Sequence, residues 1–344
     1  MTVTVSTRRR VGRTALELPV FGFGAAHLGE LYAKVDEAQS QATLAAAWDA
    51  GVRFYDTAPW YGRGLSEHRL GGFLRTRPRN EFIVNTKVGR ILHRPDDPST
   101  FSTAPWAGGL PFEVEFNYTH DGVMRAYEQV LQRLALNTVD SLVIHDLDTM
   151  FHTPEQVSGY LKQLTDGGGL KALQELKAAG DIKAIGVGNN VPGNLDEMLR
   201  AIDVDFAIVA MPYTLLDQGV LDTSMQLCLD RGISVIIGAP FASGILVTGS
   251  GAGAMYAYGK ASPEVQAKVR GIEAVCAAHQ VSMPVAALQF PLAHPAVVSV
   301  IPGAARPSEV QQNVAALEVR IPAAFWADLK AQGLLAANAP VPNH

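Results

Sequence analysis

Runs of apolar and β-branched residues recur along the chain, and most are followed by a stretch whose apolar positions have helical spacing. The runs are almost continuously apolar, which is typical of parallel strands that are buried on both faces. The predicted strands are Leu18–Gly24, Arg53–Asp56, Phe82–Lys87, Ser141–His145, Ile182–Gly188, Phe206–Met211, Ile233–Ala239 and Val297–Pro302.

The stretches between the runs predict amphipathic helices, and several of them end at a glycine, which suits the left-handed cap of a helix. The predicted helices are Asp36–Ala50, Glu67–Arg75, Asp121–Leu136, Leu170–Ala179, Leu195–Ala201, Asp222–Asp230 and Pro307–Leu317, with additional ones at Pro263–His279 and Ala323–Gln332. Eight strands that alternate with helices favour an α/β protein with a closed (β/α)8 TIM barrel over an open doubly wound sheet. No linker rich in proline, glycine or serine divides the sequence, so we expect a single domain over residues 1–344.

Three connections are too long for simple turns, namely Val88–His120, Asp146–Gly169 and Pro240–Lys260. All three follow predicted strands, so they should lie at the C-terminal face of the barrel, where the active sites of this fold are built. Long loops in compact domains are usually functional, although surface insertions are the alternative.

Charge and composition argue against some classes of binding partner. The formal net charge is −5, and the main cluster of cations, Arg8–Arg10, is predicted to be a solvated tail, which argues against nucleic-acid binding. No apolar stretch is long enough for a membrane span, and the N-terminus lacks the apolar segment of a signal peptide. Cys228 and Cys276 show neither CxxC nor metal-ligand spacing, so we expect a reduced, cytoplasmic protein without a metal.

Four polar residues stand at or just after the ends of predicted strands. Asp56, Lys87 and His145 close the second, third and fourth strands, and Tyr61 follows Asp56 by five residues. Strand ends of a barrel converge on one mouth, so these side chains should meet there. Tyr61 can act as an acid or base, Lys87 can lower the pKa of Tyr61, Asp56 can neutralise Lys87, and His145 can donate a hydrogen bond to a carbonyl.

Each of these residues also has a structural explanation when taken alone. Asp56 could cap a helix, Tyr61 could pack in a loop, Lys87 could lie on the surface and His145 could be a core histidine. Their common position at consecutive strand ends favours an active site.

Further motifs accompany the four residues in order along the chain: Gly22-Phe23-Gly24, Phe54–Ala58, Tyr61-Gly62, Ser66-Glu67, Thr86-Lys87, Gly186–Asn189, and Val300–Gly303 leading to Asn313. With these motifs the chain resembles the aldo-keto reductase family over nearly its whole length. The resemblance implies hydride transfer between a substrate carbon and a nicotinamide, with Asp56, Tyr61, Lys87 and His145 as the catalytic tetrad.

The resemblance also implies a set of residues that bind the cofactor. The Gly/Ser-rich loop after the seventh strand suggests donors to the pyrophosphate, and Gly188 in place of a serine leaves Asn189 as the better donor to the carboxamide. Two usual contacts are missing, because Ala210 and Gly238 stand where relatives have glutamine and tyrosine, so Phe241 or Tyr213 would pack on the nicotinamide. The implied set is Gly24, Ala25, Asp56, Asn189, Tyr213, Ser243, Gly244, Gly303, Arg306, Glu309 and Asn313.

The residues after the eighth strand favour NAD over NADP. Relatives that use NADP have a lysine and an arginine where this chain has Gly303 and Glu309, so a 2′-phosphate would lose two cations and meet a carboxylate. Arg306 could stack on adenine or still contact a phosphate, and Glu309 could instead be a solvated helix residue.

Within the family, the chain is most similar to the group that contains L-fucose (D-threo-aldose) 1-dehydrogenase, L-galactose dehydrogenase and pyridoxal 4-dehydrogenase. The similarity lies in Pro59–Leu70, Leu164–Leu170, Met211–Gln218 and Ile237–Leu246. It implies NAD-dependent oxidation of an aldose at C1 to the lactone. The alternatives are oxidation of pyridoxal, general NAD(P)H-dependent reduction of aldehydes, and a cofactor-binding sensor subunit.

Several residues of the long loops could bind the hydroxyls of such a sugar, although each could equally be a solvated or loop-capping residue. They are Asp96, Asp97, His120, Asp146 and Asp148.

Overall fold

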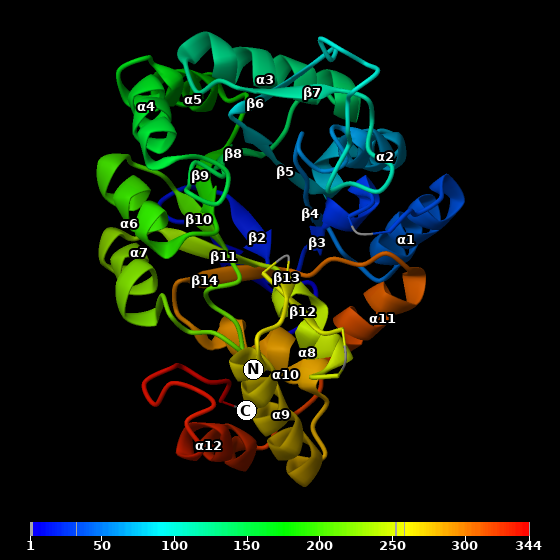
Figure 1. Ribbon diagram of the computed structural model, residues 1–344, viewed down its shortest axis with the longest axis vertical. Coiled ribbons are helices and arrows are strands. Elements are labelled where there is room, and N and C mark those ends of the chain that lie inside the picture. The colour runs from blue at the N-terminus through cyan, green and yellow to red at the C-terminus, as the bar shows by residue number, and fades with distance from the viewer. Residues whose placement is uncertain (1–2, 32, 252, 258, 344) are drawn as a thin grey trace.

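The computed structural model describes residues 3–31, 33–251, 253–257 and 259–343. Within these residues one sheet contains eight parallel strands, and helices surround it (Figure 1). The (β/α)8 barrel prediction is confirmed. In spatial order the strands are β3 (Phe23–Gly24), β4 (Phe54–Asp56), β5 (Ile83–Val88), β8 (Ser141–His145), β9 (Ala184–Asn189), β10 (Phe206–Ala210), β11 (Ser234–Gly238) and β14 (Val297–Ile301).

The barrel closes between its first and last strands. Phe21 bridges Val300 and Gly24 bridges Gly303, both in parallel. The N–H of Gly22 donates to the carbonyl of Val300 at 2.9 Å, and the N–H of Gly24 donates to that of Pro302 at 3.0 Å. A Cβ at Gly24 would lie 2.7 Å from the carbonyl oxygen of Ile301, so only glycine permits this close approach.

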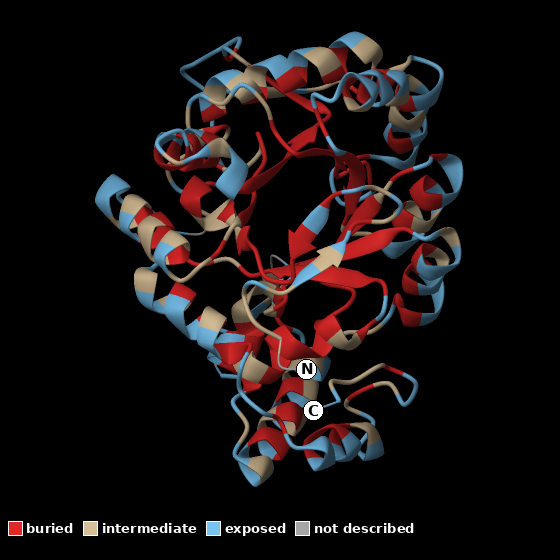
Figure 2. Ribbon diagram, turned by 180° about the vertical axis from the view of Figure 1, so that it is seen from behind, coloured by how far each residue is buried: buried red, intermediate tan, exposed pale blue. Residues whose placement is uncertain are grey.

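The helices pack their apolar sides on the sheet and expose the other side, as the colours of Figure 2 show. Gly180 and Gly232 are left-handed C-caps, as the sequence predicts. The α-helices are α1 (Glu37–Asp49), α2 (Leu65–Leu74), α3 (His120–Leu134), α4 (Pro154–Thr165), α5 (Gly169–Ala179), α6 (Pro192–Ala201), α7 (Gln226–Arg231), α8 (Ile245–Thr248), α9 (Pro263–His279), α10 (Met283–Gln289), α11 (Pro307–Ala316) and α12 (Ala323–Ala331). Shorter helical segments are η1 (Ala25–Gly29), η2 (Arg79–Glu81), the π-helical η3 (Leu221–Met225), η4 (Ala242–Gly244) and η5 (Phe290–Ala293).

The prediction of a tail at Arg8–Arg10 is wrong, although Arg8 and Arg10 are exposed. These residues form strand β1, which pairs antiparallel with β2 (Glu17–Pro19). Strand β2 of this hairpin includes the first residues of the predicted strand Leu18–Gly24. The hairpin is held because its apolar residues Val11, Leu16 and Leu18 pack against the residues inside the barrel.

The three long connections contain more regular structure than the sequence analysis assigns to them. The first forms the hairpin of β6 (Arg90–His93) and β7 (Glu113–Phe116), and the third forms η4, α8 and the strands β12 (Met255–Tyr256) and β13 (Gly259–Lys260). The second contains α4, whose capping box joins Thr153 and Gln156. Helix α10 is likewise absent from the prediction.

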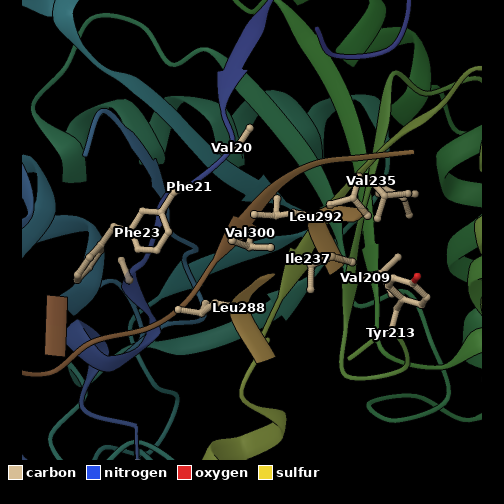
Figure 3. Close-up of a cluster of buried hydrophobic side chains, with 14 of the residues drawn as sticks. Val20, Phe21, Phe23, Val209, Tyr213, Val235, Ile237, Leu288, Leu292 and Val300 are labelled. Atoms are coloured by element: carbon tan, nitrogen blue, oxygen red, sulfur yellow. The ribbon is translucent and has the colours of Figure 1, made fainter. Parts of the chain in front are cut away.

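Two apolar clusters build the core. One fills the barrel interior, where Phe54 and Phe206 are buried, and the other lies between strands and helices, where Figure 3 shows Tyr213 beside Val209 and Ile237. Both cysteines are buried and free. None of the helices in the described residues combines the length and apolar character of a bilayer span.

Helices α2 and α3 approach closely at one glycine. A Cβ at Gly71 would overlap the backbone of Leu134 at the end of α3, whereas a Cβ at the next residue, Gly72, would meet only the side-chain amide of Gln41 at 4.0 Å. A side chain is therefore excluded at Gly71, whereas there is space for one at Gly72 in the same helix.

We expect Gly71→Ala to lower the free energy of unfolding by about 1–3 kcal/mol, because the added methyl group overpacks the α2–α3 contact. Gly72→Ala is the matched control and should raise the free energy of unfolding by up to about 1 kcal/mol, because alanine favours the helix. Urea unfolding of both variants measures the difference, and equal effects would contradict the proposed contact.

Candidate active site

The four predicted catalytic residues lie at one end of a single cavity. Asp56 and His145 are the last residues of β4 and β8, and Lys87 is the last but one of β5. Tyr61 lies in the tight turn before α2, where its N–H donates to the carbonyl of Ala58 at 3.1 Å. All four line a cavity of about 1040 Å³ at the C-terminal ends of the strands.

Lys87 and Asp56 form a buried ion pair. Lys87 Nζ donates to Asp56 Oδ2 at 2.8 Å and to the carbonyl of Thr57 at 2.7 Å, and each of the paired side chains is 3% exposed. Asn85 Nδ2 donates to the other oxygen of Asp56. Burial raises the pKa of Asp56, and the charge and hydrogen bond of Lys87 oppose that rise. An ammonium group has three donors, so one N–H of Lys87 remains available.

The surroundings of Tyr61 raise the pKa of its phenol. Lys87 Nζ lies 4.7 Å from the centre of the Tyr61 ring. Burial nevertheless moves the pKa of Tyr61 well above 10, and the carboxylates of Asp56 and Asp146 raise it further, while Arg90 lowers it. For the protein alone the net direction is opposite to the predicted lowering, because burial outweighs the nearby cations.

His145 is a neutral imidazole. Its ring lies edge-on to Tyr61 with the ring centres 6.1 Å apart. Burial lowers the pKa of His145 well below 6.5, and the cations Arg90 and Lys87 lower it further. Tyr118 Oη donates to the carbonyl of His145 at 2.7 Å, which fixes the end of β8.

A second buried ion pair, which the sequence does not predict, lies beside the tetrad. Arg90 Nη2 lies 3.0 Å from Asp146 Oδ2, and the side chains are 1% and 8% exposed. Asn190 Nδ2 donates to Asp146 Oδ1 at 3.0 Å. The signal for Arg90 is weak, since it is one arginine three residues after Lys87 in an apolar run.

Aromatic side chains form a wall at the tetrad end of the cavity. The ring centres of Trp60 and Trp106 are 5.6 Å apart, and those of Trp60 and Phe151 are 6.5 Å apart, both in edge-on contacts. We call this end the substrate end. Besides the tetrad it is lined by Leu31, Trp60, Pro105, Trp106, Asp146, Met150, Phe151 and Asn190.

Most of the predicted cofactor residues line the same cavity. They are Gly24, Asp56, Asn189, Ser243, Gly244, Gly303, Glu309 and Asn313, together with Phe241.

Three predicted cofactor residues do not line the cavity. Ala25 is buried, and its carbonyl accepts a hydrogen bond from Ser66. Arg306 is exposed at the start of α11. Tyr213 lies in the core, with its ring centre 5.4 Å from those of Phe290 and His294. The structure therefore does not bring these three residues into the cavity lining, and their contact with the cofactor stays a prediction.

Of the predicted sugar-binding residues, one lines the cavity and the others do not. Asp146 lines the cavity. Asp148 does not; it accepts hydrogen bonds from the backbone N–H groups of Asn190 and Met150. Asp97 caps Ser99 in an exposed turn, and His120 pairs with Glu175. The remaining candidate, Asp96, is also outside the lining.

Comparison with known proteins follows this geometry. Residues 20–333 match the aldo/keto reductase family. The chain belongs to the aldo/keto reductase family. It is therefore an NAD(P)-dependent oxidoreductase, and the family prediction is confirmed.

Named dehydrogenases resemble this aldo/keto reductase over nearly the full length. It is 38% identical to pyridoxal 4-dehydrogenase of Microbacterium luteolum over 97% of this chain and 100% of that protein. It is 37% identical to D-threo-aldose 1-dehydrogenase of Pseudomonas sp over 94% and 97%. It is 31% identical to L-galactose dehydrogenase of Arabidopsis thaliana over 90% and 87%.

Solved structures support the fold. An aldo-keto reductase from Bacillus halodurans superposes with a TM-score of 0.72 at 23% identity, covering 98% of this chain and 99% of that one. The glycerol dehydrogenase of Gluconobacter oxydans gives a TM-score of 0.70 at 20% identity, over 99% and 98%.

Unpaired polar atoms in the cavity fit a nicotinamide dinucleotide. Asn189 Nδ2 donates to the carbonyl of Leu147 at 3.1 Å, and the buried Asn189 Oδ1 has no partner among the described residues. Asn189 can therefore accept a hydrogen bond from a carboxamide, whereas the sequence analysis gives it the role of donor. The buried His27 Nδ1, near the other end of the cavity, also lacks a partner within the described part of the chain.

We expect Lys87→Met to lower the free energy of unfolding by about 3–5 kcal/mol, because it leaves Asp56 buried without its cation. The control is Arg13→Met, which breaks an exposed pair with Asp203 whose side chains are 71% and 65% exposed, and which should leave the urea midpoint unchanged. Equal midpoints for the two variants would show that Lys87 does not stabilise Asp56.

Proposed function

We propose that this aldo/keto reductase oxidises a cyclic hemiacetal, namely an aldose at C1, to the lactone with NAD⁺. The observation that carries the proposal is that the tetrad lines one cavity together with an aromatic wall and with buried polar atoms that have no partner among the described residues. The cavity of about 1040 Å³ can hold a dinucleotide and a substrate together.

Tyr61 is the proton acceptor in this proposal. The anomeric O–H bond and the C1–H bond break as the C1 carbonyl forms, and the proton goes to the phenolate oxygen of Tyr61, which has lost its own proton before the reaction. The free N–H of Lys87 can stabilise the charge on that oxygen. When bound, the nicotinamide supplies the carbon that takes the hydride.

His145 orients the reacting oxygen. Because its imidazole is neutral, Nε2 can exchange a hydrogen bond with the anomeric oxygen without adding a positive charge beside Lys87. This role needs the ring to stay in place, and Tyr118 holds the backbone there.

The remaining lining residues would hold the dinucleotide. Asn189 Oδ1 would accept from the carboxamide, Phe241 would pack on the nicotinamide, and the loop at Ser243 and Gly244 would face the pyrophosphate. Gly24, Gly303 and Asn313 line the same cavity and would face the adenosine part of the cofactor.

The preference for NAD rests on Glu309. Glu309 Oε2 accepts from the N–H of Ala305 at 2.7 Å, which fixes a carboxylate in the cavity where it would repel a 2′-phosphate. Arg306 is exposed and outside the lining, so no partner for a phosphate is supplied there.

Gly303 excludes a larger residue for a separate reason. A Cβ at this position would overlap the imidazole of His27. A lysine at residue 303 therefore requires His27 to move first, and a test of the cofactor preference is better made at Glu309.

We expect Glu309→Gln to raise kcat/KM for NADP⁺ relative to NAD⁺ by about threefold to fivefold, because a partly solvated charge contributes up to about 1 kcal/mol. The glutamine keeps an acceptor for Ala305. Glu264→Gln, an exposed carboxylate of α9, makes the same change in net charge and should leave the ratio unchanged. Wild-type kinetics with NADP⁺ equal to NAD⁺ would contradict the preference.

The names of two relatives support an aldose, since they act on a D-threo-aldose and on L-galactose. Pyridoxal is the second candidate. A flat, apolar ring fits the wall of Trp60, Trp106 and Phe151, and a third relative is named for that substrate. Both substrates present a hemiacetal to the same tetrad.

The deciding experiment measures NADH formation from NAD⁺ with a panel of aldoses and with pyridoxal. Oxidation of at least one aldose supports the first candidate, and activity with pyridoxal alone supports the second. Reduction of simple aldehydes with NADPH, without either oxidation, would indicate a general reductase. Retention of the cofactor without turnover would indicate a sensor subunit.

Tyr61→Phe should lower kcat by about 10²–10⁴-fold with NAD⁺ affinity within a few-fold, because it removes only the proton acceptor. Tyr213→Phe is the matched control, since it removes a buried phenolic hydroxyl outside the cavity that has no partner among the described residues. It should keep wild-type turnover. Wild-type kcat in Tyr61→Phe would exclude Tyr61 as the acceptor.

A further inference from the structure

Asp146 has an unusual backbone directly after β8. Its φ is 48°, in the left-handed region that residues other than glycine seldom adopt, although Asp tolerates it better than most. Its N–H donates to the carbonyl of Gly188 at 2.8 Å, so the conformation is fixed by the next strand. A strained residue held in a cavity wall is a candidate for a functional role.

Arg90 keeps the carboxylate of Asp146 charged. The guanidinium lies 4.9 Å from the ring centre of Phe116, 5.1 Å from that of Phe151 and 5.4 Å from that of Trp60. These rings keep Arg90 away from solvent, and in the described residues Asp146 is its ion-pair partner. A buried guanidinium stays protonated and therefore favours an ionised carboxylate beside it.

The carboxylate of Asp146 still has room for a ligand. Arg90 and His145 Nε2 lie against Oδ2 and Asn190 contacts Oδ1, while an ionised carboxylate offers about four acceptor sites. Because Asp146 lines the cavity, a substrate hydroxyl can reach the remaining sites.

The position of Asp146 relative to His145 identifies which hydroxyl this is. Asp146 Oδ2 lies 3.2 Å from His145 Nε2, the atom that faces the reacting oxygen in the proposed function. Oxygens on neighbouring carbons are separated by about one hydrogen-bond length. The two protein atoms therefore match a reacting oxygen and the hydroxyl on the adjacent carbon.

We propose that Asp146 is a specificity-determining residue that binds the hydroxyl on the carbon next to the reacting carbon, and that Arg90 is the residue that positions it. The inference rests on the proposed function and narrows its substrates to 2-hydroxy carbonyl compounds and their hemiacetals. The rest of the substrate end is mostly apolar, so this one hydroxyl is selected more strongly than the others.

The test compares two aldehydes of nearly equal size in the reductive direction with NADH. Glycolaldehyde carries the adjacent hydroxyl, and propanal has a methyl group in its place. The measured quantity is the ratio of their kcat/KM values, compared between variants, so that hydration of the free aldehydes cancels. We expect the wild-type ratio to exceed that of Asp146→Asn by about tenfold or more, because a charge-assisted hydrogen bond is lost.

Asp148→Asn is the matched control. Its carboxylate is buried two residues away, but it binds backbone N–H groups and does not line the cavity. It should keep the wild-type ratio. An equal fall of the ratio in both variants would overturn the assignment to Asp146.

The role of Arg90 is tested with variants that keep or remove the positive charge at this residue. Arg90→Lys should keep most of the hydroxyl preference, and Arg90→Met should lose it near neutral pH. In Arg90→Met the preference should return as pH rises, because burial raises the pKa of Asp146 and the carboxyl ionises only above it. A structural role for Arg90 would give a loss that does not depend on pH.

The outcomes separate the two proposals. If both aldehydes are reduced and the ratio is unchanged in Asp146→Asn, the inference fails and the proposed function stands. If neither aldehyde is reduced and no hemiacetal is oxidised, the proposed function fails and the inference fails with it.

Discussion

The ion pair of Lys87 and Asp56 depends on the register of two neighbouring strands. Asp56 pairs with Asn85 across β4 and β5, and Lys87 follows Asn85 by two residues, so both side chains point to the same face. Each then reaches one oxygen of Asp56. A shift of one residue would turn Lys87 toward the helices and leave a buried carboxylate without a cation.

The apolar runs predicted the barrel strands because burial on both faces leaves a plain signal in the sequence. They could not predict the hairpin at Arg8–Arg10, whose arginines read as solvated and whose strand forms only through packing against the barrel. Helix α4 carried a usable signal, since Thr153, Pro154 and Gln156 match a capped helix start. The hairpin depends on tertiary contacts and therefore has no local signal, whereas helix α4 has a local signal at its start.

The site also contains residues that the sequence predicts and residues that it does not. The residues at strand ends were predictable because the fold fixes where a strand ends. Arg90 begins strand β6, and Tyr213 and Arg306 lie outside the strands. The positions of these three side chains depend on tertiary contacts, and sequence spacing does not contain that information. The direction of the Tyr61 pKa also could not be predicted, because it depends first on burial and then on the carboxylates of Asp56 and Asp146.

The contact between His27 and Gly303 limits which substitutions this enzyme can accept at residue 303. Gly303 bridges Gly24 where the barrel closes, and the space above it is occupied by the imidazole of His27. A cation at residue 303 therefore needs His27 to move or to be replaced by a smaller residue. A change of cofactor use through residue 303 is thus coupled to the side chain at residue 27.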